Sequence, residues 1–205
     1  MSLWVYVGPM FSNKSSTLLT EVSRLERIGY TAYVFKPNID TRQSGIKSRI
    51  GVNRVAIGVD TWYDVSNATK DVNGEKVVIA LDELQFMPVE GMGEFLLGQL
   101  QLGTRILLSG LLCSTELDPF PSMTRAMSMA TRIIHLTAYC KICGEEAAFG
   151  ICNQVKESTV LVGDDPYEPR CFRHLPQGNP NYGRLVQNVV GDKYVPAGRG
   201  AKASP

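Results

Sequence analysis

The sequence predicts an α/β fold in which a parallel sheet carries helices on both faces and a small lobe follows it. The segments that indicate strands are continuous apolar runs rather than alternating ones, which is typical of strands buried on both faces. Segments with helical spacing of apolar residues separate these runs, and helical crossovers usually connect parallel strands. From residue 140 to 174 the chain is instead rich in cysteine and glycine, which indicates a separate lobe.

Predicted strands and helices alternate along the first two thirds of the 205 residues. Strands are expected at 3–7, 31–35, 77–81, 105–108 and 133–136, with a further short strand within 52–57. Helices are expected between Ser15 and Gly29, at 62–68 and at 92–102. We therefore expect an α/β domain over 1–137, a lobe over 138–175 and a flexible tail over 176–205.

The segment between the first strand and the first helix has the spacing of a phosphate-binding loop. Its residues are Gly8, Pro9, Met10, Phe11, Ser12, Asn13, Lys14 and Ser15. In such a loop backbone N–H groups bind phosphate oxygens, the lysine reaches the β- and γ-phosphates, and the serine hydroxyl binds Mg²⁺. Asn13 stands where the pattern has glycine, but asparagine adopts left-handed backbone conformations more readily than most residues. The alternative is a turn whose lysine is a solvated surface charge.

Two acidic residues, Asp82 and Glu83, follow the predicted strand 77–81 directly. Ligands of parallel sheets bind at the carboxyl ends of the strands, so this pair is expected beside the phosphate-binding loop. Asp82 is a candidate for the Mg²⁺ shell, and Glu83 is a candidate general base toward a substrate hydroxyl. The alternative is a strand-end turn with two solvated acids.

The overall composition excludes several classes of protein. Hydrophobic residues make up 44% of the chain, which is normal for a globular core, and a net charge of +1 gives no electrostatic case for nucleic acid or a membrane surface. No apolar run is long enough to span a bilayer, and no N-terminal signal peptide is recognisable. The chain has five cysteines, and an odd number without a secretion signal favours metal binding and a cytoplasmic location.

Four residues of types that bind metals occur in two closely spaced pairs. Cys140 and Cys143 form a Cys-x-x-Cys, while Cys171 and His174 form a Cys-x-x-His, with a hairpin-like segment over 146–169 between them. Four thiolate and imidazole ligands suit tetrahedral Zn²⁺ and leave no open position, so the site would be structural and worth about 10 kcal/mol to folding the lobe. The alternatives are a redox dithiol or ordinary core cysteines, but a redox pair leaves the second pair unexplained.

The order and spacing of these motifs resemble the zinc-containing (type II) thymidine kinases of cytosolic, viral and bacterial origin. The segments that carry the resemblance are Gly8 to Ser15, Lys36-Pro37 with Asp40-Thr41-Arg42, Asp82-Glu83 with Gln85-Phe86, Leu136-Thr137-Ala138 with Cys140 and Cys143, and Tyr167 with Cys171. The resemblance covers about residues 3–175 and implies a P-loop NTPase-like sheet. It implies transfer of the ATP γ-phosphate to the 5′-hydroxyl of thymidine or deoxyuridine, in nucleotide salvage for DNA synthesis. It also implies ATP, Mg²⁺ and a structural Zn²⁺ as cofactors, and a homotetramer.

The same resemblance implies a role for individual residues. Glu83 would be the catalytic base, and residues 8–15 would bind the ATP phosphates. The residues implied to complete the ATP and Mg²⁺ site are Asp40, Thr41, Arg42, Asp82 and Gln85. Those implied to bind the nucleoside are Met10, Thr115, Ser158, Thr159, Val160, Leu161, Val162 and Tyr167. Residues 158–162 would form a lasso over the base, and its closure would exclude water and limit idle ATP hydrolysis.

The segment after the strand 105–108 departs from the family pattern. The family has Leu-Asp-Gly-Thr-Phe here, whereas this chain has Leu111-Leu112-Cys113-Ser114-Thr115 and so lacks the phenylalanine that stacks near the base. Two further hypotheses therefore stay open: a kinase for another or a 5-modified pyrimidine deoxynucleoside, and a catalytically impaired relative that binds nucleotide. A DNA-binding zinc ribbon on an ATPase is a weaker hypothesis, because the lobe has no basic stripe with interleaved aromatic residues.

Overall fold

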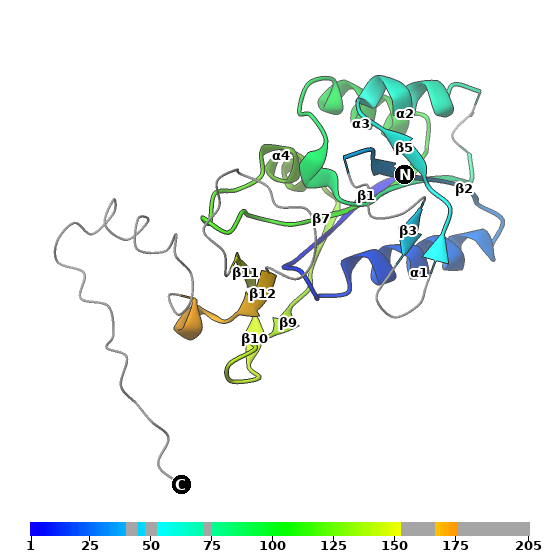
Figure 1. Cartoon of the computed structure of the whole chain (residues 1–205). Helices are drawn as coiled ribbons and strands as arrows, with labels where there is room; N and C mark the ends of the chain where they lie inside the picture. The colour runs from blue at the N-terminus through cyan, green and yellow to red at the C-terminus, as the bar shows by residue number, and fades with distance from the viewer. Residues whose placement is uncertain (40–44, 48–52, 72–74, 153–166, 176–205) are drawn as a thin grey trace, which may run out of the picture.

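The main body of the protein is a six-stranded sheet in the order β5-β2-β6-β7-β1-β8, in which every neighbouring pair is parallel (Figure 1). The structure is a computed structural model that describes residues 1–39, 45–47, 53–71, 75–152 and 167–175. The sheet strands are β1 (Ser2–Val7), β2 (Thr31–Pro37), β5 (Ile57–Val59), β6 (Val77–Leu81), β7 (Arg105–Gly110) and β8 (Arg132–His135). An all-parallel sheet requires crossovers between its strands, and helices supply most of them.

In the part of the chain that the structure describes, four α-helices lie against the sheet, and short elements fill the connections. The helices are α1 (Lys14–Glu26), α2 (Trp62–Ala68), α3 (Met92–Gln101) and α4 (Pro121–Met129). The two 3₁₀ turns are η1 (Leu84–Phe86) and η2 (Phe172–His174). The remaining short strands are β3 (Ile46–Lys47), β4 (Asn53–Arg54), β9 (Ala138–Tyr139), β10 (Glu146–Ala147), β11 (Phe149–Cys152) and β12 (Tyr167–Arg170).

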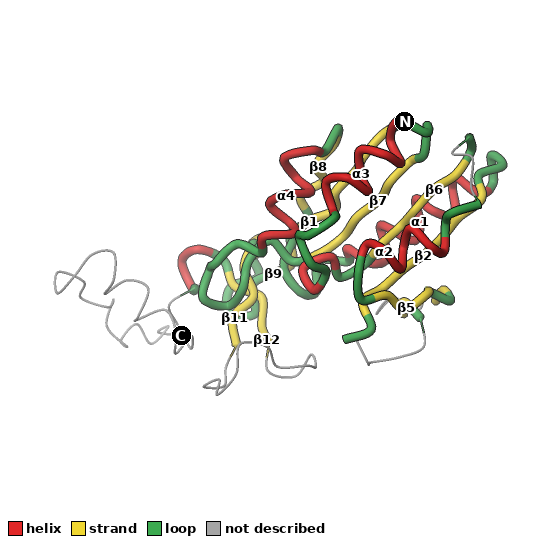
Figure 2. Tube along the Cα trace, turned by 90° about the horizontal axis from the view of Figure 1, so that it is seen from above, coloured by secondary structure: helices red, strands yellow, loops and turns green. Residues whose placement is uncertain are grey.

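The helices cover both faces of the sheet, as the continuous apolar strands predict. One buried cluster joins α1 to the sheet residues on its face, and another joins α2, α3 and α4 to the opposite face (Figures 1 and 2). Successive residues of β6 alternate between these clusters, with Val78 and Ala80 toward α1 and Val77, Ile79 and Leu81 toward the other helices. All five residues of β6 are buried, which explains why this strand has no polar alternation.

Most predicted elements are confirmed with small shifts of their ends. The short strand expected within 52–57 is β4, which lies outside the main sheet, and the edge strand β5 at Ile57–Val59 was not expected. Two further expectations need correction. Helix α4 was not expected, because its sequence is weakly apolar and has prolines just before its start and at its first residue. Pro121 occupies its first turn, where a residue without an N–H costs no helical hydrogen bond. A histidine within an apolar run is expected to be a packed core residue, but His135 is exposed because β8 is an edge strand.

The lobe has a small hydrophobic core of its own, formed by Ala138, Cys140 and Ala147 with Cys171 packed against it. Two antiparallel pairs, β9 with β10 and β11 with β12, build it, and Figure 1 shows them beyond the carboxyl end of β1. The antiparallel pairing of β11 with β12 agrees with the hairpin expected over 146–169. None of the helices within the described residues is long and apolar enough to cross a membrane.

Candidate functional site

The loop between β1 and α1 turns twice through left-handed backbone conformations. Phe11 has φ 68° and Asn13 has φ 63° and ψ 26°, so asparagine holds the conformation for which the glycine of the usual pattern is suited. Gly8 is required for a different reason, since a Cβ atom there would lie 2.1 Å from the carbonyl oxygen of Leu136. The chain that leaves β8 therefore packs directly against the start of the loop.

Lys14 is held inside this loop rather than at the surface. Its side chain is 7% exposed, and its Nζ donates a hydrogen bond of 2.7 Å to the carbonyl oxygen of Pro9. The Ser12 hydroxyl donates to the same oxygen at 2.8 Å. The alternative of a solvated surface lysine is therefore wrong. The ammonium group is placed at the helix N-terminus, where anions bind.

Asp82 is the buried acid of the site. It follows β6, is 3% exposed and accepts a hydrogen bond of 2.5 Å from the Ser109 hydroxyl on β7. Burial and, to a smaller extent, the neighbouring Glu83 raise the pKa of Asp82, while the hydroxyls of Ser109 and Ser15 and the charge of Lys14 lower it, and the resulting pKa is about 6. The phosphate loop and the acid therefore meet at one edge of the sheet, as the sequence predicts. The alternative of two solvated acids is wrong for Asp82.

Glu83 lies between β6 and η1 with a left-handed backbone, at φ 56° and ψ 42°. Its side chain is half-buried, and its Oε2 accepts a hydrogen bond of 2.5 Å from Nε2 of Gln85. A carboxylate whose orientation is fixed by a buried donor, next to a phosphate-binding loop, is suited to receive a proton from a substrate hydroxyl.

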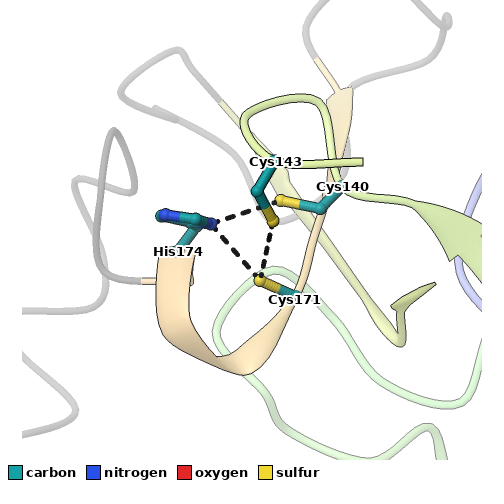
Figure 3. A group of neighbouring side chains, drawn as sticks. All are labelled: Cys140, Cys143, Cys171 and His174. Atoms are coloured by element: carbon teal, nitrogen blue, oxygen red, sulfur yellow. Dashed lines mark hydrogen bonds between the residues drawn. The ribbon is translucent and has the colours of Figure 1, made fainter. Parts of the chain in front are cut away.

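The four predicted metal ligands converge in the lobe (Figure 3). Their ligand atoms all lie within 4.8 Å of one another. The Sγ atoms of Cys143 and Cys171 are 3.8 Å apart, and Nδ1 of His174 lies 3.7 Å from Sγ of Cys140 and 3.4 Å from Sγ of Cys171. Tetrahedral Zn²⁺ with bonds of about 2.0–2.3 Å separates its ligand atoms by about 3.5–3.8 Å, so the arrangement fits this ion.

The local backbone prepares one of these thiols for metal binding. Burial raises the pKa of Cys140, but N–H groups of Cys171, Cys143 and Ile142 and the ring of His174 outweigh it and lower the pKa to about 5. The thiolate, which is the form that binds metals, is therefore favoured at neutral pH.

Ion pairs connect the strand β12 to the turn that carries Cys140 and Cys143. Glu168 contacts Lys141, which lies between Cys140 and Cys143, and it also contacts Arg170, in each case at 2.5 Å. The backbone N–H of Lys141 donates to the carbonyl oxygen of Pro169 at 3.2 Å. Tyr167, the first residue of β12 and half-buried, is thereby fixed relative to the four ligands.

Two groups of predicted site residues lie outside the described residues: Asp40 to Arg42 and Ser158 to Val162. Of the other predicted residues, Met10 lies half-buried in the phosphate loop and Thr115 is 5% exposed, in the segment after β7. Phe120, which also follows β7, packs against the core shared with α2, α3 and α4.

The structure adds two residues to this edge of the sheet that were not predicted as site residues. Ser109, the donor to Asp82, lies in the apolar run of β7. A single hydroxyl before a glycine in such a run is only a weak sequence signal of a site residue. Lys36 is the last residue but one of β2 and is 6% exposed, and a lysine that directly follows an apolar strand run is a recognisable signal in the sequence.

These features define a nucleotide-binding α/β protein with a phosphate loop, a buried strand-end acid and a lobe in which three cysteines and a histidine converge. Residues 1–175 match the family model described as thymidine kinase. A thymidine kinase of Pyrobaculum aerophilum is 34% identical over 84% of this chain and 97% of its own length. One of Mycoplasma genitalium is 33% identical over 83% and 81%, respectively. The chain belongs to the thymidine kinase family.

One solved structure illustrates a distant likeness. The genome packaging NTPase B204 of Sulfolobus turreted icosahedral virus 2, in complex with ATP-gammaS, has a TM-score of 0.43 and 16% identity, over 68% of this chain and 75% of that one. A likeness at this level carries no weight for fold or function.

Proposed function

We propose that this protein transfers the γ-phosphate of ATP to the 5′-hydroxyl of thymidine, or of deoxyuridine, in nucleotide salvage for DNA synthesis. The observation that carries the proposal is the meeting of Lys14, Ser15 and Asp82 at one sheet edge, with Glu83 next to them. Membership in the thymidine kinase family supports thymidine as the substrate.

Residues of the phosphate loop, Gly8 to Ser15, would bind the ATP phosphates through backbone N–H groups and through Lys14. Ser15 and Asp82 are the residues that would hold Mg²⁺, because a hydroxyl and a buried carboxylate already in contact are oxygen ligands of the kind this ion takes. Bound Mg²⁺ would supply neutralisation of the charge on the phosphates.

Glu83 would take the proton of the 5′-hydroxyl as its oxygen attacks the γ-phosphorus. The bond from that phosphorus to the bridging oxygen breaks, and ADP leaves. The hydroxyl is a weak nucleophile, so a positioned carboxylate at this point is the main chemical contribution of the chain, while the rest is positioning and charge.

Several further assignments belong to the same proposal. Asp40 to Arg42 are assigned to the ATP site by the resemblance, and Met10, Thr115, Ser158 to Val162 and Tyr167 to the nucleoside site. We also propose a structural Zn²⁺ on the four ligands of the lobe, division of the chain at residues 137 and 175, a homotetramer and a cytoplasmic location.

The test is a phosphoryl-transfer assay with ATP and Mg²⁺ against the natural deoxynucleosides and 5-substituted deoxyuridines. Glu83→Gln is expected to lower kcat by about 10²- to 10⁴-fold, the usual contribution of a general base, without loss of ATP binding. Full turnover in that variant would remove Glu83 from its role. Product from another nucleoside, with none from thymidine, would reject thymidine as the substrate.

A further inference from the structure

We propose that Gln85 is a positioning residue for Glu83, in place of the ATP and Mg²⁺ contact that the family resemblance implies. Gln85 is 8% exposed and lies in η1, two residues after Glu83. Its Nε2 donates to Oε2 of Glu83 at 2.5 Å, and its Oε1 accepts from the backbone N–H of Leu111 at 3.0 Å. Both ends of the amide are thus used within the protein.

The two partners fix which way the amide of Gln85 is turned. The backbone N–H of Leu111 can only donate, so it must face the amide oxygen, and the carboxylate of Glu83 then receives the amide N–H group. The side chain therefore connects the carboxylate to the backbone that leaves β7. A hydrogen bond to a charged group is among the stronger ones, which suits it to hold an orientation.

Glu83 needs such a support because its backbone is held in an unfavourable left-handed conformation. A left-handed conformation is unfavourable for a non-glycine residue and persists only where surrounding contacts hold it. The turn η1 is held a second time, since the Ser122 hydroxyl on α4 donates to the carbonyl oxygen of Leu84 at 3.0 Å. The base is thereby anchored to β7 and α4, and not only to β6.

The side chain of Gln85 packs directly against Gly110, the last residue of β7. A Cβ atom on Gly110 would lie 2.6 Å from Oε1 of Gln85 and 3.3 Å from the backbone nitrogen of Leu84. The donor at position 111 is a backbone N–H, which any residue except proline provides. The contact therefore places no demand on the side chains from Leu111 to Thr115, the segment in which this chain departs from its family.

This inference rests on the proposed function, because it takes Glu83 as the base. The variant Gln85→Met keeps the length of the side chain and removes both hydrogen bonds. Loss of an outer support of this kind typically lowers activity about 10- to 100-fold, so we expect that loss in kcat with little change in the KM for ATP. Gly98→Ala is the control, since a Cβ atom there meets no atom within 4 Å.

A double-mutant cycle separates positioning from a general structural role. In the Glu83→Gln background Gln85→Met should cause no further loss of kcat, because a residue that acts through Glu83 has nothing left to position. An undiminished loss in that background would overturn the inference. A higher KM for ATP or a higher Mg²⁺ requirement, with kcat unchanged, would return Gln85 to the ATP site and also overturn it.

A spectroscopic measurement keeps the inference testable if Gln85→Met does not fold or if the wild-type protein turns over no nucleoside. The side-chain amide protons of Gln85 are observed by NMR in the zinc-loaded protein and in Glu83→Ala. A hydrogen bond to the carboxylate predicts that one of these resonances moves strongly in the variant. Resonances that stay in place would overturn the contact, whereas absent turnover with a moving resonance would reject only the proposed function.

Discussion

At the scale of single residues, Asn13 determines whether the phosphate loop keeps its shape without the usual glycine. Its backbone is left-handed, and its side chain is exposed and makes no capping hydrogen bond to α1. The residue is therefore present for its backbone, and its amide group is dispensable. Asparagine is one of the few residues for which this conformation is inexpensive.

We expect Asn13→Gly to leave the KM for ATP and the stability nearly unchanged, and Asn13→Ala to lower the free energy of unfolding by about 1 kcal/mol with a higher KM for ATP. The reason is that alanine has a Cβ atom and no compensation in the left-handed region. Urea unfolding and steady-state kinetics measure the two effects. An alanine variant equal to the wild-type protein would show that the loop tolerates another shape.

Asp82 makes stability depend on pH in the Mg²⁺-free protein. Its pKa is about 6 in the folded protein, above the value of about 3.9 in an unfolded chain, so between these values the folded state binds more protons. Stability therefore falls as pH rises from about 4 to 6, and the loss stays constant above that range. A substitution that removes the carboxylate of Asp82 should therefore restore the stability that is lost above pH 4.

The variant Asp82→Asn is expected to exceed the wild-type protein in stability at pH 7.5 by at most about 3 kcal/mol, the equivalent of the shift in pKa, and to match it near pH 4. Urea unfolding at several pH values, without added Mg²⁺, gives the difference. Zinc loss at low pH affects both proteins and cancels in that difference. A gap that does not narrow toward pH 4 would contradict this account of Asp82.

The residues of the site differ in how far the sequence reveals them. The left-handed conformation of Asn13 and the burial of Asp82 follow from local pattern, because each depends on its own position after a strand. The bond between Gln85 and the backbone of Leu111 joins residues 26 positions apart, and no local pattern contains it. Contacts of this kind become visible only when the neighbouring strands are in register.

At the scale of elements, the same division holds between local and distant causes. Helix α2 has the predicted bounds 62–68, and its capping box at Thr61 and Asp64 is a local signal. Helix α4 was missed, although Pro121 in the first turn and buried Met123 and Ala126 three residues apart are helical signals. The helix is stabilised by packing on β1 and η1. This packing cannot be predicted from a short and weakly apolar segment.

Strand β12 depends on its charged contacts for its place in the lobe. We expect Glu168→Gln to lower the free energy of unfolding of the lobe by about 3 kcal/mol, because it removes the carboxylate that the buried Arg170 contacts. Tyr167 would lose its fixed position as well, so the KM for thymidine should rise. Urea unfolding of the zinc-loaded protein and nucleoside kinetics measure these two effects.

Lys141 provides the matched control for this prediction. It contacts the same carboxylate, but its side chain is 65% exposed, so Lys141→Met should cost less than about 1 kcal/mol. Equal effects of the two variants would mean that burial of Arg170 is not the cause.

At the scale of the whole molecule, the residues proposed to bind ATP and those proposed to bind the nucleoside lie in two different parts of the fold. The phosphate loop and Asp82 belong to the sheet, with its large cores on both faces. Tyr167 belongs to the lobe, whose core is far smaller. A lobe with so little buried apolar surface needs the energy of metal binding to keep its shape.

Zinc removal should therefore abolish thymidine turnover without weakening ATP binding. We expect the variant Cys140→Ser with Cys143→Ser to contain no zinc and to lose thymidine turnover, because the lobe can no longer hold the nucleoside over the γ-phosphate. The affinity for a fluorescent ATP analogue should stay within about twofold, since a change of 0.4 kcal/mol or less is expected where the phosphate loop packs on the sheet alone.

Cys113→Ser, outside the four ligands, should keep one zinc per chain and serves as the control for thiol replacement. Metal analysis, ATP titration and turnover on the same samples decide the matter: zinc-free protein that still phosphorylates thymidine at the wild-type rate would show that the lobe folds without its metal.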